Sequence, residues 1–157
     1  MSSYFSKIYK NAIKAENEVI KALLNENKPF HWFYGSYTDT ENNQYDCLTE
    51  GHVLIAFGFN TFAISKEKFK ILNVAQLLDK TTELSYKSAQ LVGTEPAVGS
   101  KDILCVLQTE TGEKVFFNKK YQKYFTDDVK YMVYDNISPI KIYNGDVFMG
   151  IIMLVYR

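Results

Sequence analysis

Cysteine and histidine are scarce in this chain of 157 residues, and neither sign of charge is in excess. The two histidines, His31 and His52, are too few for a histidine-rich metal site, and neither belongs to an H-x-x-x-H or H-E-x-x-H pattern. Cys47 and Cys105 lie far apart among strand-forming residues, so we expect buried free thiols rather than a disulfide. The 18 basic and 18 acidic residues balance, so only the placement of the lysines can argue for nucleic-acid binding.

Long apolar runs and catalytic motifs are also missing. No stretch reaches the ~20 apolar residues that a membrane span requires, and the N-terminus has no apolar run of signal-peptide length. We therefore expect a cytoplasmic protein with no membrane partner. There is no glycine-rich phosphate loop and no nucleophile elbow, and the acidic residues Asp39, Glu41 and Asp46 lack the glycine and the terminal glutamate of a calcium loop. We expect no catalytic residue, no metal and no cofactor.

Apolar side chains are plentiful. They make up 46% of the chain, and aromatic residues alone make up 15%, which argues against disorder and favours strands. The length predicts a single domain over residues 1–157. Near the N-terminus, apolar residues recur at helical spacing, and Pro29 follows them. This pattern predicts a long amphipathic helix over about residues 3–28.

The remaining segments predict an α+β fold in which amphipathic helices pack on antiparallel sheets. A second helix is predicted over residues 66–80, and Asn118 is a suitable cap for a short third helix that ends near Thr126. Residues 84–100 carry loop signals at Gly93, Pro96 and Gly99. Strands are predicted over residues 31–37, 44–48, 53–64, 103–108, 114–117, 130–134, 139–143 and 147–156.

Lysines form a stripe on the first predicted helix. At the helical repeat they fall within a sector of about 60°, roughly opposite the apolar face; they are Lys7, Lys10, Lys14, Lys21 and Lys28. Lys119, Lys120 and Lys123 similarly share one side of the third helix. Such rows suit a sugar-phosphate backbone, because lysines act as mobile point charges that displace counterions without reading bases. An ordinary solvated cationic face is the alternative interpretation.

Several motifs occur in an order that resembles a known family. They are Gly112-Glu113-Lys114-Val115-Phe116-Phe117-Asn118-Lys119-Lys120-Tyr121, then Ser138-Pro139, then the terminal Ile152–Arg157. Together they resemble the final half-domain of bacterial DNA sliding clamps. Leu48–Ile55 is similar to the family's "A-T-D-G-H-R-L-A" turn, and Ala63–Phe69 to its "I-P-x-K-x-L" helix entry. Val53 replaces the arginine of the turn and Leu154 replaces a proline, so the resemblance implies a short, diverged relative of phage or plasmid type.

The resemblance implies a non-enzymatic, clamp-like protein of DNA replication whose helices face double-stranded DNA. DNA-binding residues would be Lys7, Lys10, Lys14, Lys21, Lys119, Lys120 and Lys123. The turn and the C-terminal segment would form a hydrophobic surface for a replication-protein peptide, with Thr49, Gly51, His52, Met153, Val155 and Arg157. Other copies of the chain would be partners in a ring.

Two alternatives remain open at this point. The chain could be a protein-interaction module without DNA contact, a phage or mobile-element factor that binds a replication or defence protein. A hydrophobic patch around Met153 and Tyr156 would then matter, and the lysines would not. Apart from this, an ordinary turn at Thr49–His52 and a core strand residue at Met153 are the alternative to a peptide-binding surface. It could also be an enzyme with an unrecognised polar site, for which a cleft holding His52 with Glu50 or Asp46 would be the signature.

Overall fold

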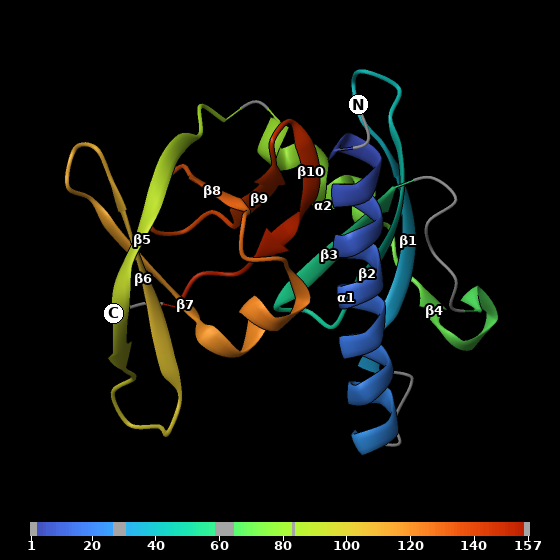
Figure 1. Cartoon of the computed structure of the whole chain (residues 1–157), viewed down its shortest axis with the longest axis horizontal. Helices are drawn as coiled ribbons and strands as arrows, with labels where there is room; N and C mark the ends of the chain where they lie inside the picture. The colour runs from blue at the N-terminus through green and yellow to red at the C-terminus, as the bar shows by residue number, and fades with distance from the viewer. Residues whose placement is uncertain (1–2, 27–30, 59–64, 83, 156–157) are drawn as a thin grey trace.

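The computed structural model describes residues 3–26, 31–58, 65–82 and 84–155 (Figure 1). Its helices are α1 (Ser3–Glu26) and α2 (Val74–Thr82), together with the short 3-10 helices η2 (Lys66–Lys68) and η3 (Lys119–Tyr124). Its strands are β1 (Phe33–Thr38), β2 (Gln44–Thr49), β3 (Val53–Gly58), β4 (Lys70–Ile71), β5 (Lys87–Pro96), β6 (Ile103–Thr109), β7 (Lys114–Asn118), β8 (Lys130–Val133), β9 (Ile140–Asn144) and β10 (Val147–Ile152).

The described strands form one mixed sheet in the order β4-β1-β2-β3-β10-β9-β8-β5-β6-β7. The α+β class is confirmed, and the sheet is antiparallel at every described pairing except that of β4, which runs parallel to β1. The sheet joins two parts of the chain because β10, the last strand, pairs with both β3 and β9. None of the helices in the described ranges is long and apolar enough to cross a membrane.

The C-terminal segment links two strands that lie far apart in the sheet order. Three residues beyond β10, the Val155 amide donates to the Phe116 carbonyl of β7 at 2.8 Å. The run from β10 through β9, β8, β5 and β6 to β7 is therefore closed upon itself by the segment that follows β10. Figure 1 shows the segment that follows β10 running toward β7.

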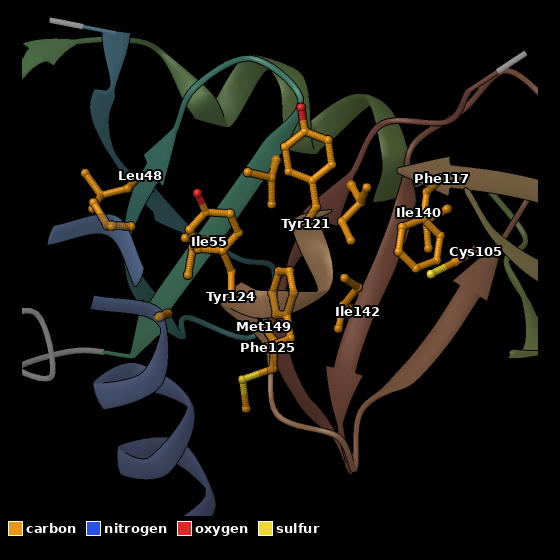
Figure 2. Packing of buried hydrophobic residues seen from close by; sticks show 14 of the residues in the cluster. Leu48, Ile55, Cys105, Phe117, Tyr121, Tyr124, Phe125, Ile140, Ile142 and Met149 are labelled. Carbon is orange, nitrogen blue, oxygen red and sulfur yellow. The ribbon is translucent and has the colours of Figure 1, made fainter. Parts of the chain in front are cut away.

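The main core lies between one face of this sheet and the pair α1 and η3. Helix α1 contributes the buried residues Ala12, Ala15 and Val19. Figure 2 shows Tyr121, Tyr124 and Phe125 between the strands that carry Leu48 and Ile55 and those that carry Cys105 and Phe117. The aromatic residues around η3 therefore contact both halves of the sheet. Burial of one such large side chain stabilises the fold by about 1.5–3 kcal/mol.

A smaller core lies on the other face, under α2. Val74 and Leu78 of this helix pack against Tyr37, Cys47, Leu54, Ala56 and Ile151. Gly35 allows the close approach, because a Cβ atom at this position would lie 2.5 Å from the Leu72 carbonyl oxygen and 2.8 Å from Val74. The sheet therefore has covered patches on both faces, α1 and η3 on one and α2 on the other.

Most predicted elements are confirmed, and one is wrong. Residues 66–80 form η2, β4 and α2 in place of a single helix, because Lys70 and Ile71 pair with β1 and Asn73 then begins a new helix. Residues 84–100, for which the sequence predicts no helix or strand and which carry loop signals at Gly93, Pro96 and Gly99, contain the long strand β5. The predicted residues 27–28 of the first helix and 59–64 of the third strand lie outside the described residues.

Two local predictions are confirmed in detail. The Asn118 side chain caps η3, accepting a hydrogen bond from the Lys120 amide at 3.0 Å, although the helix is a 3-10 helix that ends at Tyr124. Cys47 and Cys105 are free and buried. Burial, reinforced by the nearby Asp46, raises the pKa of Cys47 to about 12, so this thiol is protonated and unreactive at neutral pH.

Candidate functional site

A groove of about 890 Å³ lies between α1, η3 and the strands β5 and β8. Four lysines line it: Lys14 from α1, Lys119 and Lys123 from η3, and Lys130 from β8. The carboxylate in its lining belongs to Asp127. We refer to this cavity as the lysine groove. Its cations converge from segments that are distant in sequence, and it has the charge expected for an anionic ligand.

A buried hydrogen bond holds α1 against the segment that follows η3. Asn11 is 2% exposed, and its side-chain oxygen accepts from the Thr126 amide at 3.1 Å. Ala12 and Ala15 pack beside it in the main core, and their small side chains let the two elements approach closely. This contact places Lys14, one turn along from Asn11, at the wall that η3 supplies.

The lysines of η3 are supported by aromatic rings. The ammonium of Lys120 lies 5.1 Å from the centre of the Tyr121 ring, and that of Lys123 lies 5.2 Å from the centre of the Tyr124 ring. Both rings are buried, while both ammonium groups are at the surface. A cation over a ring face gains about 0.5–1 kcal/mol at an exposed site and remains available to a polyanion.

Neutral donors complete the groove. Gln122 and Tyr131 line it beside the lysines. Burial raises the pKa of Tyr131, while a hydrogen bond from Gln122 opposes that change. The Tyr131 phenol therefore stays protonated at neutral pH and can donate to an anionic oxygen. The lining thus combines ammonium groups with neutral hydrogen-bond donors, a set that suits phosphate oxygens.

The predicted DNA-binding lysines divide into two groups. Lys14, Lys119 and Lys123 meet in the lysine groove, whereas Lys10 and Lys21 are exposed elsewhere on α1. Lys21 forms an ion pair with Glu18 at 3.3 Å. The Lys7 side chain and all of Lys28 lie outside the described parts of the chain. Sequence reasoning missed Lys130, since no helical period relates a residue at the start of β8 to the stripe on α1.

The predicted peptide-binding turn is held by its own side chains. The Thr49 hydroxyl donates to the Val53 carbonyl at 2.8 Å and accepts from the Gly51 amide at 3.1 Å. Glu50 accepts from the amides of His52, at 2.6 Å, and Val53, at 3.0 Å. Gly51 has a φ of 108°, a conformation that favours glycine. The turn is therefore a locally specified structure.

The structure brings this turn together with the C-terminal segment. The Met153 amide donates to the His52 carbonyl at 2.8 Å, and Met153 and Val155 are both half-buried. The His52 ring stacks on Tyr121, with 6.1 Å between ring centres and 10° between planes. Thr49, Gly51, His52, Met153 and Val155 therefore share one region, while Arg157 lies outside the described residues. In the part of the chain that the structure describes, none of them lines the lysine groove.

The polar residues of the enzyme alternative lie in two clusters. His52 is a surface residue whose Nδ1 lies 3.6 Å from Glu50 Oε2. Asp46 instead accepts a short hydrogen bond from the Tyr34 hydroxyl and pairs with Lys66 at 3.2 Å. Within the described ranges, no group of three or more His, Cys, Asp or Glu side chains could hold a metal ion.

Comparisons with family models, with curated proteins and with solved structures give no match for this chain. The resemblance to sliding clamps therefore rests on the quoted motifs, and functional inference rests on the lysine groove and the junction of the turn with the C-terminal segment.

Proposed function

We propose that this chain is a non-enzymatic, clamp-like DNA-binding protein that holds the phosphate backbone of double-stranded DNA in its lysine groove. The observation that carries the proposal is the convergence of Lys14, Lys119, Lys123 and Lys130 on one groove in a chain with no net charge. The assignment to DNA replication rests on the motif resemblance.

The chemistry of the groove favours the backbone over the bases. Lysine ammonium groups are strongly hydrated point charges that neutralise phosphates, whereas base reading commonly uses the planar fork of arginine or the amides of Asn and Gln. Lys10, Lys21 and Lys120 are exposed on the same two helices and extend the cationic surface beyond the groove. Such contacts give affinity without sequence preference.

Salt dependence provides the first quantitative test. If the four lysines of the groove each neutralise one phosphate, the logarithm of the affinity falls against the logarithm of salt concentration with a slope of about −3.6. Fluorescence anisotropy of a labelled 20-base-pair duplex, titrated at several salt concentrations, measures this slope. A slope near zero, or no binding at low salt, would overturn the proposal.

A matched pair of triple variants identifies the surface. Lys14→Glu, Lys119→Glu and Lys123→Glu together are expected to abolish the salt-sensitive binding, because the groove then carries like charge toward phosphate. Lys70→Glu, Lys80→Glu and Lys101→Glu make the same change in net charge at exposed positions that do not line the groove, and should leave most of the binding. Equal losses in both variants would show that net charge, not the groove, binds the duplex. Circular dichroism and thermal unfolding verify that each variant folds.

A second candidate function is a protein-interaction module without DNA contact. The observation that favours it is the junction of the turn with the C-terminal segment, where the Met153 amide bonds to the His52 carbonyl. A short hydrophobic peptide of the kind captured by clamp clefts, labelled for anisotropy, tests this surface. Met153→Gln together with His52→Ala should weaken its binding, whereas the groove variants should not. Peptide binding without duplex binding would favour this function over the first.

A further inference from the structure

A second cavity, of about 270 Å³, lies on the sheet face opposite the lysine groove. Successive side chains of β9 point to opposite faces of the sheet. Ile140 and Ile142 belong to the main core, whereas Lys141 and Tyr143 point to the other face and line this cavity. Leu78 and Thr81 of α2 close one side. The DNA-binding proposal makes no use of this cavity.

Aromatic rings form its walls. Tyr37 and Tyr45 are direct partners across β1 and β2 and stack with 6.3 Å between ring centres and 21° between planes. Tyr143 and Phe148 are direct partners across β9 and β10, with ring centres 5.7 Å apart. Tyr45 meets Phe148 edge-on, at 5.8 Å and 84°. The strand register therefore joins these rings into one continuous aromatic surface, which we call the aromatic pocket.

Carboxylates surround the rings. Asp39, Glu41 and Asp146 line the aromatic pocket from the hairpin loops at its mouth. Asp39 is held in place, because its carboxylate accepts hydrogen bonds from the amides of Glu41 and Asn43, each at 2.9 Å. Lys141 is the cation in the described lining. Its ammonium donates to the Thr81 carbonyl at 3.2 Å and lies 4.7 Å from the centre of the Tyr86 ring. These contacts hold the positive charge beside the C-terminal end of α2.

Burial and the charge of nearby carboxylates raise the pKa of two tyrosines of the pocket, Tyr143 and Tyr37. Burial raises the pKa of Tyr143, and the negative charge of Asp39 raises it further. Burial also raises the pKa of Tyr37, followed by the charges of Asp79 and Asp39. The phenols are neutral at pH 7, and the lining carries the carboxylates of Asp39, Glu41 and Asp146 with the ammonium of Lys141, the reverse of the charge balance in the lysine groove.

We propose that the aromatic pocket binds a small organic cation that carries an alkylated ammonium group. A ring face attracts a cation through its quadrupole, and several rings with nearby carboxylates recognise alkylated ammonium ions. Such an ion is weakly hydrated and can be desolvated in the cavity against the rings of Tyr45, Tyr143 and Phe148, whereas an anionic ligand is repelled by the carboxylates. The group could be part of a free small molecule or of a methylated lysine side chain, and the shared feature is the alkylated cationic head.

Choline and its neutral isostere 3,3-dimethylbutan-1-ol separate charge recognition from simple apolar binding. Isothermal titration calorimetry of the full chain should show saturable choline binding in the range of about 0.1–1 mM. Saturation-transfer NMR should connect the choline methyl protons with tyrosine ring protons. The neutral isostere should bind at least about tenfold more weakly, because it lacks the cation–π and carboxylate attraction. Equal binding of the two compounds, or no saturable choline binding, would overturn the proposal.

Variants locate the site. Phe148→Leu should weaken choline binding about fivefold by removing one ring, and Tyr143→Phe should preserve it because the ring remains. Asp146→Asn, an exposed loop substitution that leaves the core intact, should also weaken binding, whereas Asp102→Asn on the distant β5–β6 connection should not. Unchanged affinity in the folded Asp146→Asn and Phe148→Leu variants would overturn the site.

The two sources of the group are distinguished by a further titration. A short peptide with one trimethyllysine is compared with the same peptide carrying unmodified lysine and with free choline. A preference for the methylated peptide over choline assigns the ligand to a protein side chain, and the reverse assigns it to a free small molecule. Binding of the unmodified peptide as tightly as the methylated one contradicts recognition of the alkylated head.

Discussion

The lysine groove and the aromatic pocket lie on opposite faces of one sheet and carry opposite charge. Lysines from α1, η3 and β8 line the groove, whereas loop carboxylates and strand aromatics line the pocket. The chain as a whole has 18 basic and 18 acidic residues. A net charge of zero therefore does not mean that charge is evenly distributed, because the two cavities have linings of opposite charge. Net charge alone is a poor guide to what such a chain binds.

The two buried cysteines lie in different cores and near charges of opposite sign. Cys47 lies in the core under α2, where burial and the charge of Asp46 both raise the thiol pKa. Cys105 lies in the main core, where burial raises the thiol pKa but the positive charge of Lys119, a groove residue, opposes it. The two thiols therefore lie near charges of opposite sign, one in each core.

The largest expected effect is at Gly150, in β10 between the two halves of the sheet. Its φ is 149°, and an added Cβ would lie 2.1 Å from the Leu54 carbonyl oxygen. Gly150→Ala should destabilise the protein by about 3 kcal/mol or more, through strain and a backbone clash. Urea unfolding measures the loss. Gly93→Ala, with open space around the added Cβ, is the control and should be nearly neutral.

Gly150→Ala should affect binding at both sites, whereas the local changes described below should affect one site alone. Because β10 contacts both β3 and β9, loss of the fold should abolish duplex and choline binding together. A Gly150→Ala variant as stable as the wild type would show that the sheet accommodates the added methyl group and would contradict the assigned register.

The second largest expected effect is a difference in salt dependence between duplex binding and choline binding. A rise from 50 to 200 mM salt should weaken duplex binding by about 100-fold if four phosphates are neutralised. Choline binding should change by less than about threefold, since one small cation releases few counterions. Parallel titrations of the same protein sample measure both. Equal salt sensitivity of the two ligands would mean that they do not occupy sites of opposite charge.

Replacing Asn11 should weaken duplex binding in the lysine groove and leave choline binding in the aromatic pocket unchanged. Asn11→Leu leaves the buried Thr126 amide without its partner and should cost about 1–3 kcal/mol in the free energy of unfolding. The variant should also bind the duplex more weakly, because Lys14 loses its fixed position beside η3, while choline affinity stays unchanged. Asn17→Leu on the exposed side of α1 is the matched control. Loss of choline affinity in Asn11→Leu would indicate that the two sites are coupled.

Alkaline pH should have the smallest effect. The folded-state pKa of Cys47 is raised to about 12 from an ordinary value of 9.0, so the folded protein retains a proton that the unfolded chain releases. Its contribution to stability is full below pH 9 and declines as pH rises from 9 toward 12, by at most about 1.4 kcal/mol per pH unit.

Urea unfolding at pH 8 and pH 10, with reductant present, tests this prediction. Wild type should lose roughly 1 kcal/mol more than Cys47→Ala between the two pH values. The comparison with Cys47→Ala removes the contribution of the tyrosines, which ionise in both proteins. An identical pH dependence in the two proteins would show that the Cys47 thiol is not protected from ionisation.

Local patterns explain most elements but not their pairing. Hairpins with polar tips, the cap at Asn118 and the amphipathic period of α1 each depend on neighbours in sequence, and each is confirmed. The prediction of one helix over Lys66 to Lys80 is wrong, because its apolar residues fit a helical period while Lys70 and Ile71 pair with β1. Tertiary pairing overrides helical propensity in short segments. The sequence does not predict β5, because its side chains are mostly exposed and leave no alternation of apolar and polar residues.

The sequence by itself determined the α+β class, the buried thiols and the lysines of α1 and η3, since these depend on composition and short-range periodicity. Only the tertiary structure decided that Lys130 joins three of those lysines, that β10 connects the two halves of the sheet, and that four aromatic rings meet under a rim of carboxylates. The physical reason is that strand register brings together residues about 100 positions apart, such as Tyr45 and Phe148, and no local pattern encodes that register.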